Sequence, residues 1–393
     1  MVRRAESKDH MKILWLHSHF LNWMGGHKYV FEVTKRFSKD HQVTVCTSVA
    51  SDYAKKQFQT INVPLHTVNF LSTNNPLYWF FLKQMINYEV SKLRVFANSA
   101  DVIITSYFPA HLWAKKLNKP YIQICFEPLA FFYDQKFLSG YAFPIRLFYR
   151  SMKALYNRLD KEALLAAKSV LTLSKFNKDW IKSVYGRKDI GVVYEGVDTD
   201  FFKPTKNKTL QKKYSGKRII LHSTDFTPTK GTDLLVNSLP KVVKRFPNLL
   251  LLITSTLGNL KKMEFLADKL GVRKNIVFLG NVDYLLLPAY YTLADVVVQP
   301  TRGQSMSLTV KEAMACEKPV ITGLEGREMI QDGEEGFLVN SINKEALSSA
   351  IIKILKNRRL SLQMGKKGRK IIKEKFSWDK VSDSILKSID DIF

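Results

Sequence analysis

The sequence has few of the features that mark secreted, disulfide-linked or membrane-spanning proteins. Its 393 residues include three cysteines, Cys46, Cys125 and Cys316, whose wide separation fits neither a disulfide framework nor a zinc site. The polar segment 1–10 and the interrupted apolar run after it form no signal-peptide core. No apolar run reaches the roughly 18 residues that a membrane-spanning helix needs. These absences predict a soluble protein of a reducing compartment, the cytoplasm.

Glycine and proline are also scarce. The chain has 18 glycines and 13 prolines, with 46% hydrophobic and 24% charged residues, which excludes a disordered, fibrous or repetitive protein. A chain of 393 residues is too long for one ordinary core. It therefore predicts two globular domains.

Acidic residues are too few to balance the basic ones. The 35 Asp and Glu residues stand against 61 Lys and Arg residues, which leaves a formal net charge of +26. Such an excess predicts an anionic partner. Nucleic acid, an acidic membrane surface and phosphorylated small molecules all qualify, but no nucleic-acid recognition motif accompanies the charge.

Short apolar runs rich in β-branched residues recur along the chain, each followed by an amphipathic stretch. This alternation is typical of α/β domains with parallel sheets. The expected strands are 12–16, 43–47, 101–105, 121–125, 169–173 and 191–194 in the first half, and 218–222, 249–254, 275–279, 295–298, 319–322 and 336–339 in the second. Each half is therefore predicted to be a Rossmann-like, doubly wound domain.

The segment between the halves indicates a domain boundary. Residues 195–215 carry Pro204, several lysines and no sustained apolar period. We expect a flexible N-terminal extension at 1–10, a first domain at 11–204, a second at 205–376 and a terminal segment at 377–393. Ser377 is a candidate N-cap, and the apolar spacing after it predicts a terminal amphipathic helix.

Two loops carry residues suited to binding an anion. Gly25 and Gly26 follow the first strand and open a helix, where glycine allows close approach of the backbone to a ligand. Lys230 stands at the mouth of the loop after strand 218–222, where an ammonium group suits a diphosphate. A tight turn without a ligand explains the glycine pair equally well, and a lysine in so basic a chain can simply be solvated.

The segment 304–315, Gln-Ser-Met-Ser-Leu-Thr-Val-Lys-Glu-Ala-Met-Ala, combines three polar functions. It follows strand 295–298, so we expect Gln304 in the loop, Ser307 and Leu308 at a helix start, and Glu312 inside the helix. Helix-start amides can hold a diphosphate, a carboxylate can accept hydrogen bonds from a ribose, and an amide side chain can bind sugar hydroxyls. On spacing alone, a surface helix with a solvated glutamate is the alternative.

This segment and its neighbours resemble the retaining glycosyltransferases of family 4, which have the GT-B fold. In that family a Glu, seven residues and a second Glu precede Ala-Met-Ala and a strand, as Glu312 precedes residues 313–315 and 318–321 here. Further matches follow in the same order over nearly the whole chain: Gly25-Gly26, Gly196-Val197-Asp198 with Phe202 and Pro204, Lys230-Gly231, Glu328-x-Ile330-x-Asp332-Gly333-x-x-Gly336, and Trp378.

The resemblance implies two Rossmann-like domains that face a cleft, with the C-terminal helix crossing back to the first domain. It implies a nucleotide-sugar donor on the second domain, an acceptor on the first, and neither a metal nor a further cofactor. The implied donor-binding residues are Gly25, Gly26, Lys230, Gln304, Ser307, Leu308, Thr309 and Glu312. The implied catalytic candidates are Lys230, Gln304, Glu312 and Glu127.

The chain departs from the family pattern on the donor side. Gln304 stands where the family has the first Glu of its pair, so this position is a neutral reader of hydroxyl groups rather than an anion. Asp225 stands where the family usually has an Arg before its Lys, which removes half of the expected phosphate clamp. Arg302 and Arg327 are the candidates to replace it.

On the acceptor side, Phe126 stands where the family often has a His, so Glu127 becomes the polar candidate facing the acceptor. Asp198-Thr199-Asp200 looks like a metal-binding Asp-x-Asp, but its place at the domain junction favours coincidence. The histidines show no metal-site spacing, and His17 and His19 are interpreted as structural or cleft-lining.

Aromatic residues alternate with Lys and Arg in segments 76–99 and 136–168. This mixture suits the headgroup layer of an anionic membrane, although rings in the core with solvated cations would read the same way. We favour membrane contact because both segments belong to the domain that receives the acceptor in the resembling family, and many such acceptors are lipid-linked.

These inferences predict a retaining glycosyltransferase that moves a hexose-type sugar from a UDP- or GDP-sugar to a lipid-linked or membrane-proximal glycan, at the cytoplasmic face of a membrane. The alternatives of the same fold are a sugar-nucleotide epimerase and a noncatalytic binder of sugar nucleotides or glycans. The alternative of a different class is a nucleic-acid-binding protein.

Overall fold

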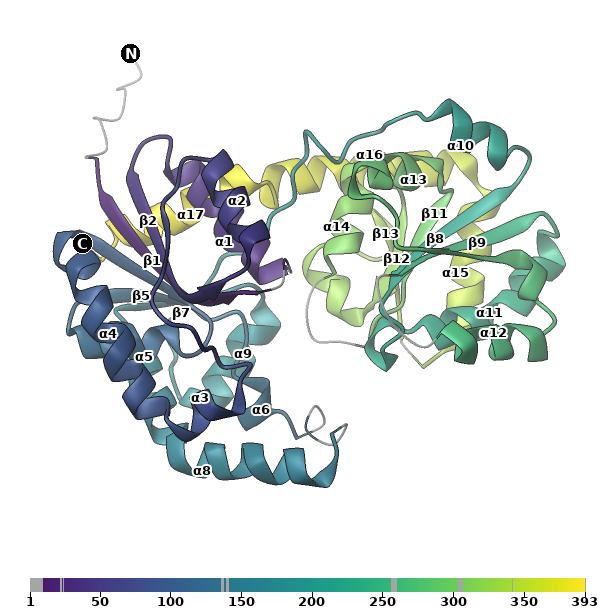
Figure 1. Ribbon diagram of the computed structural model, residues 1–393. Coiled ribbons are helices and arrows are strands. Elements are labelled where there is room, and N and C mark those ends of the chain that lie inside the picture. Colours follow the sequence, from purple (N-terminus) through teal and green to yellow (C-terminus); the bar gives the residue numbers. More distant parts are fainter. Residues whose placement is uncertain are drawn as a thin grey trace, which may run out of the picture. The chain divides into compact units, whose positions relative to one another are not determined.

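The computed structural model describes residues 10–21, 23, 25–135, 138, 141–255, 260–302, 307–340 and 342–392. The chain forms two compact units (Figure 1). The first unit contains Met1–Tyr194 and Val381–Phe393, and the second contains Glu195–Lys380. The division falls at the start of the segment interpreted as a linker, and the short helix α10 (Lys208–Lys213) occupies part of that segment.

A seven-stranded parallel sheet forms the middle of the first unit, in the order β3-β2-β1-β4-β5-β6-β7. Its strands are β1 (Lys12–Phe20), β2 (Gln42–Ala50), β3 (Leu65–Thr67), β4 (Val102–Ser106), β5 (Tyr121–Ile124), β6 (Ser169–Thr172) and β7 (Ile190–Val192). Its helices are α1 (Gly25–Phe37), α2 (Asp52–Thr60), α3 (Pro76–Phe80), α4 (Leu82–Ser99), α5 (Ala110–Leu117), α6 (Ala130–Tyr133), α8 (Phe143–Ala166), α9 (Lys175–Tyr185) and α17 (Trp378–Asp390), which enters this unit at Val381.

Strand order in this sheet reverses between β1 and β4. Leu14 of β1 faces Thr44 of β2 on one side and Ile103 of β4 on the other. Because the chain winds outward in opposite directions from these two central strands, the loops at their carboxyl ends part and leave room for a ligand.

The second unit repeats this plan with six parallel strands in the order β10-β9-β8-β11-β12-β13, so its reversal lies between β8 and β11. Its strands are β8 (Arg218–Thr224), β9 (Leu249–Ser255), β10 (Ile276–Gly280), β11 (Val296–Gln299), β12 (Val320–Gly323) and β13 (Gly336–Val339). Its helices are α11 (Thr232–Arg245), α12 (Leu260–Lys269), α13 (Leu287–Leu293), α14 (Leu308–Ala315), α15 (Lys344–Lys356) and α16 (Arg358–Lys375), with 3-10 turns η1 (Pro228–Lys230), η2 (Arg273–Asn275), η3 (Tyr284–Leu286) and η4 (Leu324–Glu328).

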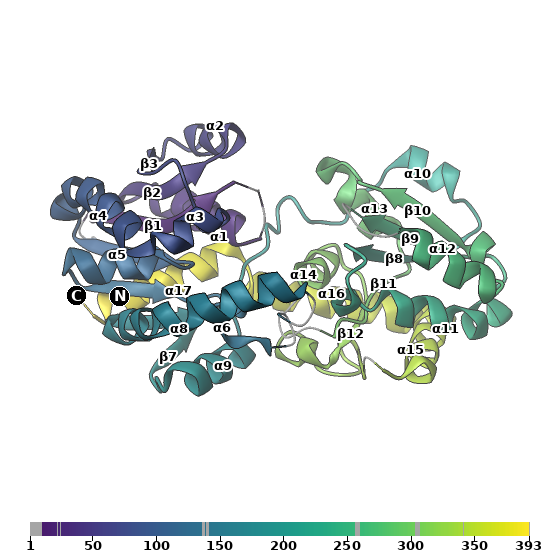
Figure 2. The same ribbon diagram turned by 60° about the horizontal axis from the view of Figure 1, so that its bottom comes forward.

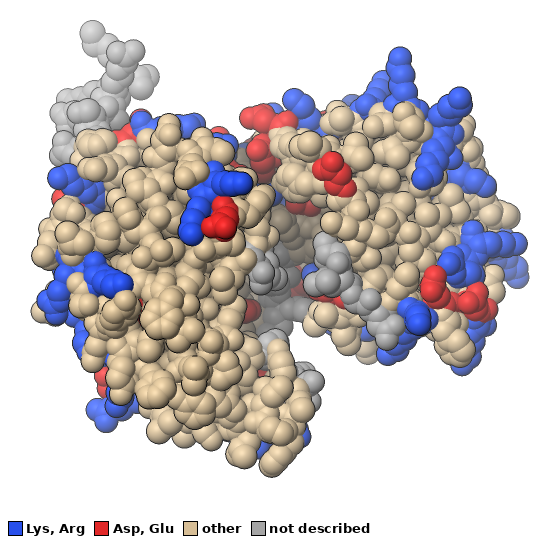
Figure 3. Space-filling model, in the orientation of Figure 1, with Lys and Arg blue, Asp and Glu red and all other residues tan. Residues whose placement is uncertain are grey.

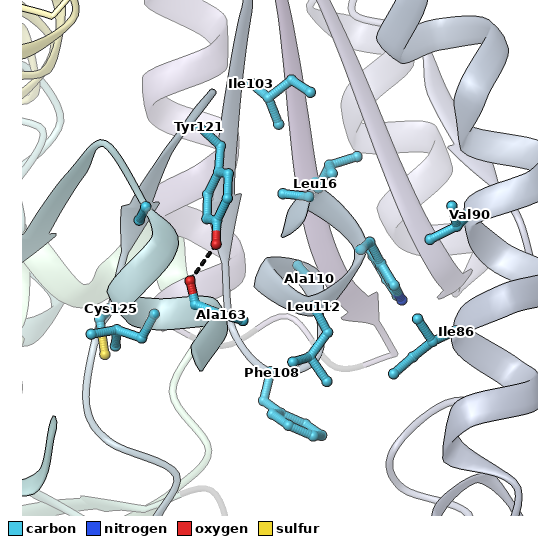
Figure 4. Close-up of a cluster of buried hydrophobic side chains, with 14 of the residues drawn as sticks. Leu16, Ile86, Val90, Ile103, Phe108, Ala110, Leu112, Tyr121, Cys125 and Ala163 are labelled. Atoms are coloured by element: carbon cyan, nitrogen blue, oxygen red, sulfur yellow. Dashed lines mark hydrogen bonds between the residues drawn. The ribbon is translucent and has the colours of Figure 1, made fainter. Parts of the chain in front are cut away.

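Helices cover both faces of each sheet, as buried parallel sheets require. In the first unit, α4, α5 and α8 pack on one face, while α1 and α17 lie on the other side (Figure 1). Figure 4 shows part of the core on the first of these faces, where Leu16 and Ile103 of the sheet meet side chains of α4 and α5. The Tyr121 hydroxyl donates a hydrogen bond to the Ala163 carbonyl there, so the one polar atom of that ring is satisfied.

The fold-class prediction is confirmed, because both units are parallel-sheet α/β structures. Every strand expected from the sequence is present, with ends shifted by a few residues. The apolar pattern does not predict β3, because its three residues are half-buried or exposed. The predicted terminal helix corresponds to α17, whose Val381, Ile385 and Ile389 are buried.

The junction motif around Gly196 has a packing reason. A Cβ atom on Gly196 would lie 2.6 Å from the Trp378 ring, so only glycine fits against this indole. Val197 N donates to Phe376 O at 2.8 Å, which joins the start of the second unit to the residues just before α17. Asp198 Oδ1 accepts hydrogen bonds from two backbone amides of the following turn, at 3.0 Å each, which is a structural role.

A carboxylate lies inside the core of the first unit. Glu89 of α4 is fully buried and accepts hydrogen bonds from Ser48 Oγ at 2.7 Å, Asn69 Nδ2 at 2.9 Å, Tyr78 OH at 2.7 Å and Trp113 Nε1 at 2.8 Å. Burial raises the pKa of Glu89, and these donors oppose the rise. The carboxylate therefore connects β2, α3, α4 and α5 through one side chain.

Glu89→Ala should lower the free energy of unfolding by about 3–5 kcal/mol, because it leaves three buried donors and the half-buried Asn69 amide without their acceptor. Urea denaturation of the variant tests this, with Glu162→Ala on exposed α8 surface as the control that should be nearly silent. Equal stability of the Glu89 variant and the wild type would contradict the structural role.

Candidate active site

In the second unit, the loops after β8 and β11 touch through their backbones. Gly231 has a φ of +68°, and a Cβ atom there would lie 2.0 Å from the Pro300 carbonyl oxygen, so glycine is required on both counts. Arg302 N also donates to Thr229 O at 2.7 Å. This contact fixes Lys230, the residue before Gly231, at the point where strand order reverses.

A chain of hydrogen bonds locks the start of α11 against β8. His222 Nδ1 lies 2.8 Å from the Val298 carbonyl and therefore donates, so Nε2 accepts from Thr232 Oγ1 at 2.9 Å. Thr232 in turn accepts from Thr224 Oγ1 at 2.7 Å. Burial lowers the pKa of His222 to about 4, so the imidazole is neutral and contributes order rather than charge.

The acidic residue in the loop after β8 lowers the local positive charge. Asp225 Oδ1 accepts from Thr227 N at 2.9 Å and from Thr227 Oγ1 at 2.6 Å. Burial by itself would raise the pKa of Asp225, but the hydrogen bonds from Thr227, with the charge of Lys230, bring it below its ordinary value. Lys230 is half-buried, and its positive charge is partly offset by the ionised carboxylate of Asp225.

Arg302 is already engaged. Its guanidinium binds Asp233 in bidentate fashion at 2.8 and 2.9 Å and donates to Pro228 O at 3.0 Å. This ion pair joins the loop after β11 to the first turn of α11 and lowers the pKa of Asp233 against the opposing effect of burial. Arg327 is exposed on η4. The geometry therefore assigns Arg302 a bracing role between the two loops.

Helix α14 positions the predicted carboxylate. Ser307 is its N-cap residue and its side chain makes no capping hydrogen bond, so the amides of the first turn have no side-chain cap. Glu312 is 6% exposed, and Tyr291 OH of α13 donates to its Oε2 at 2.7 Å. Thr309, one turn earlier on α14, is half-buried. A carboxylate held this way is aligned before any ligand arrives.

The neighbouring lysine of α14, Lys311, is buried and has a structural role. Lys311 is 1% exposed, and its Nζ donates to Glu195 O at 2.8 Å, with Glu195 Oε2 at 3.5 Å. Burial lowers the pKa of Lys311. These adjacent residues of α14 therefore make different contacts. Lys311 binds Glu195 at the start of the second unit, whereas Glu312 binds Tyr291 of α13. Gln304, the remaining predicted residue of this segment, lies outside the described residues.

A further carboxylate, Glu325 of η4, follows the carboxyl end of β12. Gly323 makes room for it, because a Cβ atom there would lie 2.3 Å from both Glu325 Oε2 and Thr301 O. Burial raises the pKa of Glu325 to about 7 from 4.5. Sequence reasoning missed this residue, since nothing in the pattern indicates that its side chain folds back onto the end of β12, where Thr322 Oγ1 lies 3.4 Å from its Oε1.

In the first unit, aromatic and imidazole rings gather where β1 and β4 separate. His17 lies 5.3 Å from His27 and 5.2 Å from Tyr107 between ring centroids, and His19 lies 5.4 Å from His27. Burial, with repulsion from His27, lowers the pKa of His17 and brings that of His19 to about 4. These two imidazoles are therefore neutral hydrogen-bonding groups rather than cations.

The predicted glycine pair lies in this cluster. Helix α1 begins at Gly25, and a Cβ atom on Gly26 would lie 2.5 Å from the Tyr107 ring. The missing side chain of Gly26 therefore accommodates Tyr107, a residue with a positive φ of 63° that the sequence analysis did not single out. Whether a ligand also uses these amides stays a prediction.

Phe126 takes a packing role at the position where the resembling family often has a His. It is 7% exposed and its ring lies 4.8 Å from Tyr107 and 5.2 Å from Tyr29. Glu127, the next residue, is exposed. Among the described residues, no group of three His, Cys, Asp or Glu side chains has the arrangement needed to hold a metal ion.

The predicted residues thus fall into two groups. Lys230, Ser307, Leu308, Thr309 and Glu312 all lie in the second unit, on the loop after β8 or on α14 after β11. Gly25, Gly26 and Glu127 lie in the first unit, at the loops after β1 and β5. Tyr291 was missed because a tyrosine within an apolar helix gives no sequence signal for a contact 21 residues away.

Comparison with known proteins identifies this chain as a glycosyltransferase. Residues 205–371 match the family model of glycosyl transferases group 1, and residues 23–201 match that of glycosyltransferase family 4. The solved structure of Anabaena HepE in complex with UDP has a TM-score of 0.77 at 18% identity, covering 97% of this chain and 100% of that one. At this identity the likeness shows the fold alone, and the fold is GT-B.

Relatives of known sequence extend the comparison. A GDP-mannose-dependent alpha-(1-6)-phosphatidylinositol monomannoside mannosyltransferase of Mycolicibacterium smegmatis is 31% identical over 196 residues, 47% of this chain and 51% of that protein. The chain therefore spans about half the length of this relative. An uncharacterized glycosyltransferase of Methanocaldococcus jannaschii is 25% identical over 379 residues, 94% of this chain and 95% of its own. The chain belongs to the family 4 glycosyltransferases.

Glu325→Gln should reduce the pH dependence of stability. Because the pKa of Glu325 is higher in the folded state than the ordinary 4.5, its contribution to stability is complete below pH 4.5 and is lost as the pH rises through about 7. Glutamine has no such transition, so the wild type should lose roughly 1–3 kcal/mol relative to the variant across this window. Urea denaturation of both proteins at several pH values measures the difference. Parallel pH profiles would show that the carboxyl ionises normally.

Proposed function

We infer that this chain transfers a sugar from a nucleotide-sugar donor that binds the second unit. The observation that carries the proposal is the 2.7 Å hydrogen bond from Tyr291 of α13 to Glu312 of α14. Helix α14 follows β11 at the reversal of strand order. Open α/β sheets bind nucleotides at such a reversal. A buried, pre-aligned carboxylate there suits the two hydroxyl groups of a ribose.

Two sets of groups in the second unit could bind the phosphate groups of the donor. The amides of Ser307 and Leu308 at the start of α14 suit a diphosphate, because helix N-termini attract anions. Lys230 lies on the neighbouring loop, which Gly231 holds against Pro300. An ammonium group there would stabilise the charge that develops on the departing diphosphate. Retention of configuration is an expectation from the family resemblance.

The donor class follows from related proteins in broad terms. One relative is named as GDP-mannose-dependent, and the HepE structure contains UDP. These names support a UDP- or GDP-sugar as donor for this chain, with a hexose as the transferred group. No group in the proposed chemistry requires a metal, since Lys230 and the helix amides supply the positive potential.

A lipid-linked or membrane-proximal acceptor is the proposed second substrate, consistent with a relative named for a phosphatidylinositol mannoside. Among the described residues, no helix is long and apolar enough to cross a membrane. We propose peripheral attachment at the cytoplasmic face instead. Of the rings in segment 76–99, Tyr78 and Trp79 are buried in the core, whereas Phe80 and Phe81 are 59% and 50% exposed.

Glu312→Ala should abolish binding of the donor, because it removes the acceptor for the ribose hydroxyls. A thermal-shift panel of UDP- and GDP-sugars first identifies the nucleotide that stabilises the wild type. The variant should give no shift with that nucleotide, and Glu312→Gln, which keeps the shape, should give a reduced one. Glu345→Ala, at an exposed residue of α15, is the control. An undiminished shift in the alanine variant would refute the site.

Lys230→Ala should weaken the affinity for the nucleoside diphosphate by roughly 1.5–3 kcal/mol, the scale of a charge-assisted hydrogen bond. Isothermal titration with UDP and GDP measures the change, and Lys244→Ala at an exposed position of α11 is the matched control. Unchanged affinity would remove Lys230 from the diphosphate site. Product analysis separates the remaining alternatives, since an epimerised sugar without acceptor indicates an epimerase and binding without any product indicates a noncatalytic binder.

A further inference from the structure

The first unit contains a basic pocket that the proposed sugar transfer does not use. It lies between α6 and α8, has a volume of about 280 Å³, and is lined by Phe131, Phe132, Arg146, Arg150 and Lys153 among others. None of the described residues that line it is acidic. Figure 2 brings α8 and the neighbouring α6 to the front. Positive charge and aromatic walls make the pocket suitable for an organic phosphate.

The three cations form one stripe of α8. Arg146, Arg150 and Lys153 are spaced by four and three residues, so they follow one another along a single helix face. Within the described part of the chain none of them has a carboxylate partner, in contrast to Arg158, which pairs with Glu162 at 2.7 Å. Nε of Arg146 is buried and meets no hydrogen-bond acceptor among the described residues.

Aromatic rings, not carboxylates, contact two of these three cations. The Arg146 guanidinium lies 6.0 Å from the Phe143 ring centroid, and Lys153 Nζ lies 5.2 Å from that of Tyr133. Cation–π contacts orient a cation without neutralising it. The stripe therefore keeps its full positive charge for an external anion.

An exposed apolar stripe runs beside the cations on the same helix. Phe143, Leu147 and Leu155 are 65%, 53% and 61% exposed. The next apolar side chain, Phe148, lies 5.6 Å from Phe80 of α3 between ring centroids, so the apolar surface continues onto α3. Figure 3 shows a broad face over α3 and α8 with few charged side chains and with lysine and arginine at its edges. A water-soluble phosphate would need the pocket but not this surface.

We propose that the pocket between α6 and α8 binds the phosphate headgroup of an anionic phospholipid while the apolar stripe of α8 lies in the headgroup layer. Cations beside exposed aromatic and aliphatic side chains are the composition that the interfacial layer of a membrane favours. The phosphodiester would occupy the pocket, and Phe143 and Leu147 would contact the upper parts of the acyl chains. The inference gives the peripheral attachment of the proposed function a specific place, but it requires neither donor nor acceptor.

Cosedimentation with vesicles tests the proposal on the full chain. The wild type should bind vesicles of phosphatidylcholine with phosphatidylglycerol and should not bind pure phosphatidylcholine. The triple variant Arg146→Gln, Arg150→Gln, Lys153→Gln should bind the anionic vesicles about tenfold or more weakly, since each cation near the surface contributes to attraction. A control with the same loss of charge, Lys244→Gln, Lys356→Gln, Lys366→Gln at exposed residues of the second unit, should change binding by less than about threefold.

The apolar stripe has its own variant, Leu147→Gln, Leu155→Gln, which should also weaken binding to anionic vesicles while leaving the cations intact. Thermal shifts with the donor nucleotide show that each variant is folded and that its second unit is active in binding, so failure here is distinct from failure of the proposed function. Equal binding to both vesicle types, or equal losses in the pocket and control variants, would overturn the proposal. Stabilisation by glycerol phosphate that the pocket variant loses, with unchanged vesicle binding, would overturn it in favour of a soluble phosphate.

Discussion

The contact between the loops after β8 and β11 is the constraint on which the second unit's site depends. Gly231 lies so close to the Pro300 carbonyl that no side chain fits between them. That approach sets the position of Lys230 on one loop relative to residues 300–302 on the other. The ion pair of Arg302 with Asp233 and the hydrogen bonds of His222 hold the same two loops from their sides. Loops braced in this way would need little reorganisation to receive the diphosphate of the proposed donor.

The two units have the same sheet plan but place different side chains at the carboxyl ends of their central strands. Each parallel sheet reverses its strand order and so leaves room at the carboxyl ends of its central strands. The second unit fills that room with a lysine, helix-start amides and an aligned carboxylate. The first unit fills it with neutral imidazoles and the ring of Tyr107. In the proposed function the charged groups would bind the nucleotide diphosphate, and the neutral ones the hydroxyl groups of a glycan.

The lysine and arginine residues of the chain also differ in whether a carboxylate pairs with them. In the second unit, Lys311 donates a hydrogen bond to Glu195, and Arg302 forms an ion pair with Asp233. On α8, Arg146 and Lys153 lie against aromatic rings, next to exposed apolar side chains. Net charge by itself pointed to an anionic partner without choosing one. The positions of Lys230 and of the α8 cations are the basis for proposing a nucleotide phosphate in one unit and a lipid phosphate in the other.

Local patterns along the chain predicted the parallel α/β class, the strands except β3 and the helix start before Glu312, because apolar periodicity, glycine spacing and local capping act over a few residues. It also separated the aromatic basic segments but could not tell core rings from exposed ones. Three further properties became visible in the folded chain: Tyr78 is buried and Phe80 exposed, Tyr291 aligns Glu312, and burial raises the pKa of Glu325 to about 7. Those properties arise from contacts between residues distant in the chain, and desolvation has no counterpart in local sequence.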